Sequence, residues 1–219
     1  MIRVKICGIQ SLEEALWAVE AGADALGFIL VPSSKRYIEP NAIQMISSHL
    51  PPFVSKVGVF ADESPAKVAS ITRQSVLDTL QFHGGEDLEL YREIPVPKIK
   101  VISFPSLSNG DSRDFIYRQP RLPHSLHGIL LDSNHQGHTG GTGVPLPWQD
   151  THFQDFLREI KKTGYPVILA GGLNPENISD AIRQTNPYGV DVSSGIELHG
   201  RKDRELIQKF VYRAKSLNL

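Results

Sequence analysis

Short apolar runs alternate with helix-forming segments along almost the whole chain, and this alternation restricts the fold more than any other feature. The run Ala25–Leu30 is apolar throughout, which is typical of strands covered on both faces, as in parallel sheets. Before it, the segment 12–19 places apolar residues at i, i+3, i+4 and i+7, the spacing of a helix that packs on a sheet. A strand, a helix and a further strand form the repeating unit of α/β folds.

The pattern recurs until the end of the chain. Eight strands are predicted, at residues 4–7, 25–30, 53–60, 79–83, 98–103, 128–132, 166–170 and 189–192. Helices are predicted from Ser11, where Ser11 and Glu14 have capping-box spacing, and at 40–49, from Ser64, after Glu86, at 111–117, at 148–163, from Asn174 and from Asp203.

Eight strands that alternate with about eight helices favour a closed (β/α)₈ TIM barrel of the α/β class. The alternative is an open, doubly wound sheet. Such a sheet prefers a Gly-x-Gly-x-x-Gly turn after its first strand, and Cys7-Gly8-Ile9-Gln10 is not one. A chain of 219 residues suits one well-packed domain, so we expect a single domain over residues 1–219.

Composition limits the partners and the compartment. The net charge of −1 gives no reason to expect nucleic acid or an anionic membrane, and no apolar run is long enough to cross a bilayer. The single cysteine excludes an internal disulfide framework and fits a reducing compartment. The first strand begins too early for a cleaved leader. We therefore expect a soluble, cytoplasmic protein without nucleic-acid or membrane partners.

Polar and glycine residues follow the apolar strands, where TIM barrels carry their catalytic groups. In chain order these are Cys7, the Ser-Ser-Lys-Arg loop at 33–36, Asp62, His83, Ser103, Asp132, Gly171-Gly172 and Ser193-Ser194-Gly195. The last two sets follow strands seven and eight, the usual phosphate grip of this fold. Glycines there let backbone N–H groups approach an anion, and serine hydroxyls add donors. The alternative is that these glycines only make tight turns.

Two residues are candidates for proton transfer. Asp132 ends an apolar strand, where an unpaired carboxylate is costly, so an acid role is favoured over a cap or a rim salt bridge. Cys7 ends the first strand near the predicted phosphate loops and suits a thiolate nucleophile or base. The alternative for Cys7 is a small buried apolar residue.

Other polar residues have weaker signals. Arg36 suits bidentate binding of a carboxylate, although a solvated arginine is an equal alternative. His83 is a candidate substrate contact or a rim histidine with internal partners. His124, His127, His135 and His138 lack the ligand partners of a metal site, so no metal is expected. The glycine-rich segment 140–143 lacks the following Lys and Ser or Thr of a P-loop and is expected to lie over the site.

Taken together, the motifs resemble the phosphoribosylanthranilate isomerase family of tryptophan biosynthesis, nearly end to end. The matching segments are Lys5-Ile6-Cys7-Gly8-Ile9, Gly22-Ala23-Asp24-Ala25-Leu26-Gly27-Phe28, Ser34-Lys35-Arg36-Tyr37, Gln81-Phe82-His83-Gly84, Leu130-Leu131-Asp132-Ser133, Gly140-Gly141-Thr142-Gly143, Leu169-Ala170-Gly171-Gly172-Leu173-Asn174 and Gly189-Val190-Asp191-Val192-Ser193-Ser194-Gly195-Ile196-Glu197.

The resemblance implies a TIM barrel that performs the Amadori rearrangement of N-(5-phosphoribosyl)anthranilate to 1-(2-carboxyphenylamino)-1-deoxyribulose 5-phosphate without a cofactor. It implies Cys7 as general base, Asp132 as general acid and Arg36 as the partner of the anthranilate carboxylate. Substrate contacts are expected at His83, and the phosphate contacts at Gly171, Gly172, Ser193, Ser194 and Gly195. The partner is then a small phosphosugar and the chain a monomer or a homodimer, and transient contact with other tryptophan-pathway enzymes is left open as a further interaction.

Three rival functions stay open at this point. The related isomerase of histidine biosynthesis catalyses the same rearrangement on a larger bisphosphate but is expected to use two aspartates, whereas Cys7 occupies the first position here. A phosphosugar-binding barrel without catalysis would not need Cys7 and Asp132 together. A lysine-dependent aldolase or synthase needs a lysine inside the barrel, for which Lys5, Lys56 and Lys100 are candidates.

Overall fold

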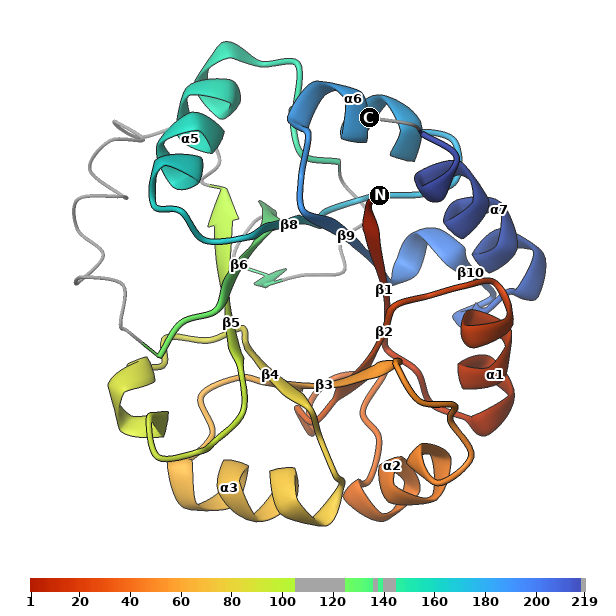
Figure 1. Cartoon of the computed structure of the whole chain (residues 1–219), viewed down its shortest axis with the longest axis vertical. Coiled ribbons are helices and arrows are strands. Elements are labelled where there is room, and N and C mark those ends of the chain that lie inside the picture. Colours follow the sequence, from red (N-terminus) through yellow and green to blue (C-terminus); the bar gives the residue numbers. More distant parts are fainter. Residues whose placement is uncertain (105–124, 136–137, 140–144, 218–219) are drawn as a thin grey trace.

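The computed structural model describes residues 1–104, 125–135, 138–139 and 145–217, in which parallel strands close into a barrel with helices around it (Figure 1). The predicted fold class is therefore confirmed. The barrel strands are β1 (Arg3–Cys7), β2 (Ala25–Ile29), β3 (Ser55–Phe60), β4 (Thr79–Phe82), β5 (Lys98–Phe104), β6 (Gly128–His135), β8 (Val167–Leu169) and β9 (Gly189–Val192).

Each barrel strand pairs in parallel with its neighbours, and the order β5-β4-β3-β2-β1-β9-β8-β6 is closed by the pairing of β5 with β6. β1 lies between β2 and β9, with Lys5 opposite Asp191 and Cys7 opposite Gly27. Because all eight strands are parallel, their carboxyl ends meet at one mouth of the barrel. Two further pairings were not predicted: β7 (His138–Thr139) returns antiparallel onto the end of β6, and β10 (Glu197–Leu198) forms a hairpin with β11 (Arg201–Lys202).

The helices follow the predicted order with shifted boundaries. They are α1 (Leu12–Glu20), α2 (Pro40–Ser47), α3 (Pro65–Gln74), α5 (Thr151–Lys162), α6 (Ile178–Thr185) and α7 (Arg204–Lys215), with the 3₁₀ helices η1 (Leu88–Tyr91) and η2 (Ser194–Ile196). The helix predicted at 111–117 and the loop predicted at 140–143 lie outside the described residues.

Local hydrogen bonds explain three boundaries that sequence reasoning placed too early. α5 begins at Thr151 rather than at 148, because the Asp150 side chain accepts hydrogen bonds from the N–H groups of residues 152 and 153. Asn174 caps the turn before α6 instead of α6 itself, since its Oδ1 accepts from the N–H groups of residues 176 and 177. β3 begins at Ser55 because Phe53 has a left-handed φ of 70°.

The capping prediction at α1 is confirmed in part. Ser11 Oγ accepts a hydrogen bond from the Glu14 N–H at 3.2 Å, as expected. Glu14 reaches back to the N–H of Gln10 at 2.7 Å instead of the N–H of Ser11. The reciprocal bond of a capping box is thus displaced by one residue, and it fixes the turn that leaves Cys7.

Apolar side chains fill the space between the barrel and its helices. Phe28, Phe60, Phe82, Phe153 and Phe210 in this layer are each fully buried. Val101, Leu130 and Ala170 form a separate, smaller apolar cluster with Ile99 and Ile168. The mouth half of the interior also holds charge, because Lys5 and Asp191 are buried and paired with each other.

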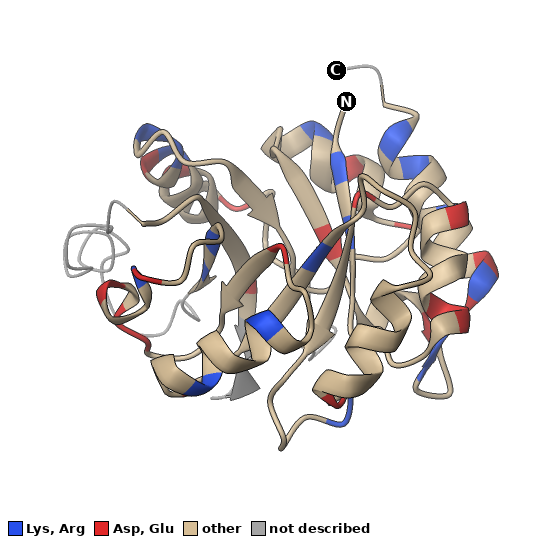
Figure 2. Ribbon diagram, turned by 60° about the horizontal axis from the view of Figure 1, so that its bottom comes forward, with Lys and Arg blue, Asp and Glu red and all other residues tan. Residues whose placement is uncertain are grey.

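The outer surface mixes charges of both signs. Figure 2 shows Lys and Arg interleaved with Asp and Glu over the helices, and exposed ion pairs such as Glu20 with Arg204 join neighbouring helices. Among the described helices, none has the length and apolar character needed to cross a membrane.

The loops after β8 and β9 touch each other through their backbones. A Cβ atom on Gly195 would lie 1.9 Å from the carbonyl oxygen of Leu173, so a side chain does not fit there without movement of the main chain. Gly171 has φ of 76° and faces the backbone N–H of Ser133, so the loop after β8 also meets the end of β6. Glycine therefore sets the spacing of three strand ends.

We predict that Gly195→Ala destabilises the protein by about 1–3 kcal/mol, the usual range for forced overpacking. The thermal unfolding midpoint should fall by several degrees in calorimetry or circular dichroism. Gly85→Ala is the matched control, because its Cβ would meet Asp62 at an ordinary contact distance of 3.7 Å. Equal midpoints for the Gly195 variant and the wild type would contradict the close approach.

Candidate active site

The predicted site residues converge at the carboxyl ends of the strands. Cys7 ends β1, His83 follows β4, Asp132 lies in the last part of β6, Gly171 and Gly172 follow β8, and Ser193 follows β9. A cavity of about 330 Å³ at the opposite end is lined by strand starts such as Arg3, Ala25 and Ser55. Since TIM barrels carry their chemistry at the carboxyl ends, the candidate site is the mouth that holds Cys7 and Asp132.

Asp132 is buried, with 7% of its surface exposed. Its Oδ1 accepts a hydrogen bond from the Ser133 N–H at 2.8 Å. Burial raises the pKa of Asp132 from 3.8 to about 6; the Ser133 N–H opposes this shift, and the nearby Asp191 carboxylate adds to it. A carboxyl group with this pKa exchanges its proton near neutrality, as a general acid requires.

His83 lies beside Asp132 at the mouth. Its Nε2 lies 3.7 Å from Asp132 Oδ2, beyond a normal hydrogen bond, and lacks a hydrogen-bond partner within the described part of the chain. Burial lowers the pKa of His83, so the ring is neutral at pH 7. A neutral imidazole with an unsatisfied nitrogen at this point suits a hydrogen bond with a bound molecule.

Cys7 lies among several charged groups. Burial raises the pKa of the Cys7 thiol; the Lys5 ammonium is the largest opposing influence, Asp191 adds to the rise and Lys202 lowers it again. The charge on a Cys7 thiolate would also interact favourably with the guanidinium of Arg36, whose pKa it raises. The thiol is therefore protonated at rest near neutrality, with cations next to the position where a thiolate would form.

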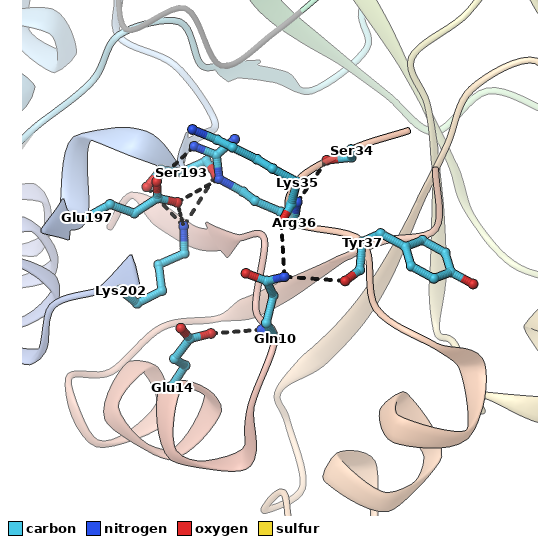
Figure 3. A network of polar contacts seen from close by, with 9 residues as sticks. All are labelled: Gln10, Glu14, Ser34, Lys35, Arg36, Tyr37, Ser193, Glu197 and Lys202. Atoms are coloured by element: carbon cyan, nitrogen blue, oxygen red, sulfur yellow. Dashed lines mark hydrogen bonds and ion pairs between the residues drawn. The ribbon is translucent and has the colours of Figure 1, made fainter. Parts of the chain in front are cut away.

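Arg36 extends from the loop after β2 toward the hairpin after β9 (Figure 3). Its Nε and one terminal nitrogen donate to the two carboxylate oxygens of Glu197 at 2.6 and 2.8 Å, a bidentate pair in which both side chains are largely buried. A guanidinium has five N–H donors, so this pair does not exhaust its capacity. The alternative that Arg36 is a solvated surface residue is wrong, because only 7% of it is exposed.

Glu197 and Lys202 are site residues that sequence reasoning did not single out. Lys202 Nζ donates to Glu197 Oε1 at 2.7 Å and to the carbonyl oxygen of Ser193 at 3.0 Å. Burial alone would raise the pKa of Glu197, yet Arg36 and Lys202 hold it below its usual value, so the carboxylate is charged. Figure 3 shows this network, which ties the arginine loop to the serine loop after β9.

Charged residues on the other side of the mouth serve the structure of the loops. Glu86 accepts hydrogen bonds from the N–H groups of Asp62 and Gly84 and pairs with Lys100 at 2.8 Å. At the opposite end of the barrel, near the start of β3, Lys56 pairs with Asp78. Of the three lysines considered for an aldolase, Lys56 and Lys100 thus have structural partners near the surface and the rim, and Lys5 is buried in the interior.

The family model for N-(5'-phosphoribosyl)anthranilate (PRA) isomerase matches residues 4–213. A curated relative of that name from Desulfitobacterium hafniense (strain Y51) is 56% identical, and the match covers 98% of this chain and 98% of the relative. The similarity therefore includes every strand end described above.

Two solved structures show the same architecture. A phosphoribosyl anthranilate isomerase in complex with reduced 1-(o-carboxyphenylamino)-1-deoxyribulose 5-phosphate has a TM-score of 0.78 and 39% identity, covering 99% of this chain and 100% of the other. Monomers generated from the dimeric enzyme of Thermotoga maritima have a TM-score of 0.77 and 37% identity, with coverage of 99% and 100%. The chain belongs to the N-(5'-phosphoribosyl)anthranilate isomerase family, a family of isomerase enzymes in tryptophan biosynthesis.

Proposed function

We propose that this enzyme carries out the Amadori rearrangement of N-(5-phosphoribosyl)anthranilate with Cys7 as general base and Asp132 as general acid. The observation that carries the proposal is the pair itself: a carboxyl group with a pKa near 6 and the only cysteine of the chain at one mouth, on strands separated by the two glycine and serine loops. The complex of a relative with reduced 1-(o-carboxyphenylamino)-1-deoxyribulose 5-phosphate supports a phosphosugar ligand.

The first two steps of the rearrangement, ring opening and enolamine formation, need one proton given and one taken. Asp132 gives a proton to the furanose ring oxygen, the C1'–O bond breaks, and the nitrogen lone pair forms an iminium. Cys7, as thiolate, removes the proton from C2', and the electrons of that C–H bond form the enolamine. The enolamine then tautomerises to the ketone, with its hydroxyl proton lost and a proton gained at C1'. No electrons enter or leave, so no redox cofactor is needed.

In the resting enzyme the protonation states of the two groups are the reverse of those that the reaction needs. At neutral pH the raised pKa of the Cys7 thiol keeps it protonated, and Asp132 with a pKa of about 6 is largely ionised. The reactive form differs by one proton that moves from Cys7 to Asp132, and it is populated according to the gap between the two pKa values. Any group that reduces the difference between these two pKa values therefore raises the population of the reactive form and the rate of turnover.

The remaining residues hold the substrate. We assign the phosphate to backbone N–H groups of Gly171, Gly172 and Gly195 and to the hydroxyls of Ser193 and Ser194. In the ring, β8 and β9 lie between β6 and β1, so a phosphate held there presents the sugar to the acid on one side and the base on the other.

The anthranilate carboxylate is assigned to Arg36, which keeps donors beyond its Glu197 pair. His83 is assigned a hydrogen bond to the substrate near Asp132. Two carboxylates around one guanidinium are compatible because its N–H groups point along different edges of the plane.

Cytoplasmic location, the single domain over residues 1–219 and the choice between monomer and homodimer stay predictions. The dimeric relative from Thermotoga maritima favours a homodimer, and the fully exposed Phe53 at the amino-terminal end of the barrel offers an apolar contact for it. Light scattering after gel filtration measures the mass directly.

We expect Cys7→Ala and Asp132→Asn each to lower turnover by about 10²–10⁴-fold, because each removes one proton-transfer group. The assay is the loss of phosphoribosylanthranilate fluorescence with purified protein. Substrate should still bind, since the phosphate loops and Arg36 are unchanged. A Cys7→Ala variant with near-normal turnover would refute the base assignment.

At neutral pH the buried, ionised carboxylate of Asp132 should lower the free energy of unfolding of the protein. Its folded pKa of about 6 exceeds the ordinary 3.8, so the carboxyl stabilises the fold most at low pH and this contribution is lost as pH rises through 6. Asp132→Asn should therefore raise the free energy of unfolding by about 1–3 kcal/mol at pH 8, from 1.36 kcal/mol per pKa unit. Urea titrations at pH 5 and pH 8 measure this; an equal gain at both values would contradict the raised pKa.

Glu197→Gln should raise KM for the substrate about tenfold or more, because Arg36 loses its charged bidentate partner. The effect on kcat should be smaller, since Glu197 orients Arg36 and does not transfer protons. Glu205→Gln is the control, as Glu205 lies exposed on α7 and pairs only loosely with Lys209 at 3.6 Å. Loss of kcat with an unchanged KM would argue against this role.

A further inference from the structure

Lys5 is a buried cation directly below the proposed base. It lies two residues before Cys7 on β1, so both side chains point to the same face of the strand, the barrel interior. A Cβ atom on Gly27, opposite Cys7 on β2, would meet Cys7 Sγ at 2.7 Å and Lys5 Nζ at 3.0 Å. Both atoms thus border one small space, which exists because residue 27 has no side chain.

The ammonium of Lys5 is held in place and kept charged. It donates to Asp191 Oδ1 at 2.9 Å, and the two residues are opposite each other in the pairing of β1 with β9. Burial by itself would lower the pKa of Lys5, but Asp191 and Cys7 outweigh it and the pKa is raised. A protonated amine is not a nucleophile, so the Schiff-base role considered for a barrel lysine does not fit Lys5.

Stability alone does not account for such a pair. Removing two charges from water costs several kcal/mol per ion, and apolar residues of similar volume often stabilise a core as well or better. Many TIM barrels fill their interior with branched apolar side chains. The pair of Lys5 and Asp191 lies beside the Cys7 thiol, which must ionise to act as a base, so its charges can change the stability of the thiolate.

We propose that Lys5, anchored by Asp191, is a positioning residue whose fixed positive charge stabilises the thiolate of Cys7 during catalysis. This inference rests on the proposed base role, although its physical content concerns Cys7 alone. Other charged groups also face Cys7: Arg36 from the loop after β2, Lys202 from β11 and Asp191 from β9. Lys202 is already shared between Glu197 and Ser193, whereas Lys5 has the thiol and one carboxylate as its neighbours in charge.

The charges near Lys5 extend the effect across the mouth. The Lys5 ammonium lowers the pKa of both His83 and Asp132, and the Asp191 carboxylate raises the pKa of both. The pair is thus oriented with its cation at the base and its carboxylate toward the acid. With this orientation, Lys5 lowers the pKa of Cys7 and so reduces the difference between the pKa values of Cys7 and Asp132.

The test titrates Cys7 without substrate. Because the chain has one cysteine, the pH dependence of iodoacetamide alkylation, followed by intact mass, reports its thiolate directly. In Lys5→Met the midpoint of the rate profile should rise by one pH unit or more, or move beyond the measurable range. Lys5→Arg keeps a positive charge, so its midpoint should lie close to that of the wild type. An unchanged midpoint in Lys5→Met would overturn the proposal.

Two further variants separate this effect from damage to the fold. Lys5→Met with Asp191→Asn removes both charges together, which avoids an unpaired buried carboxylate. Its midpoint should still rise above that of the wild type, but by less than in Lys5→Met, because Asp191 itself raises the pKa of Cys7. Lys56→Met removes another strand lysine with an aspartate partner and should leave the Cys7 midpoint unchanged. Equal shifts in Lys56→Met and Lys5→Met would overturn the specific role of Lys5.

Activity provides the second readout. Lys5→Met should lower kcat at least tenfold with little change in KM, and the loss should diminish as pH rises toward the shifted thiol pKa. A loss of kcat that is the same at every pH would contradict the proposal. If Cys7→Ala retained turnover, the base assignment would fail while the alkylation result on Lys5 still stood, so the two hypotheses fail separately.

Discussion

A closed barrel has to fill its own interior, and this constraint organises the whole site. Most of the filling is apolar, as in the cluster of Val101, Leu130 and Ala170. At the level just below the mouth, the strands β1 and β9 contribute Lys5 and Asp191 instead. Two opposite charges at hydrogen-bonding distance are tolerated there because each satisfies the other, and they act electrostatically on Cys7 and Asp132, the proposed base and acid.

The same ring order decides how a substrate can be held. The loops after β8 and β9 are tied together where Gly195 meets the carbonyl of Leu173, and the first of them rests on the end of β6 at Ser133. The second is tied through Ser193, Lys202 and Glu197 to Arg36. The proposed phosphate contacts and the proposed carboxylate contact therefore belong to one connected set of hydrogen bonds and close backbone contacts.

Much of this was predictable from the sequence, because strand ends are readable. Apolar runs locate the strands, and the polar residue after each run, such as Cys7 or Asp132, falls at the mouth of any parallel barrel. Glu197 and Lys202 were missed because they follow the last barrel strand in a short hairpin, and their partners Arg36 and Ser193 are chosen by three-dimensional contact. Lys5 had a usable signal: a lysine inside an apolar strand, on the same face as Cys7, has to find a partner in the interior.

Burial is the largest cause of both the raised pKa of Asp132 and the raised pKa of Cys7, and it has opposite consequences for their proposed roles as acid and base. For the acid, burial is useful because it brings the pKa to about 6. For the base it is harmful because it favours the neutral thiol. In the proposed mechanism the iminium intermediate has to be kept from water, so Cys7 cannot be exposed to solvent to lower its pKa. A fixed cation below the thiol resolves this conflict, since it offsets the burial of the base and leaves the acid buried.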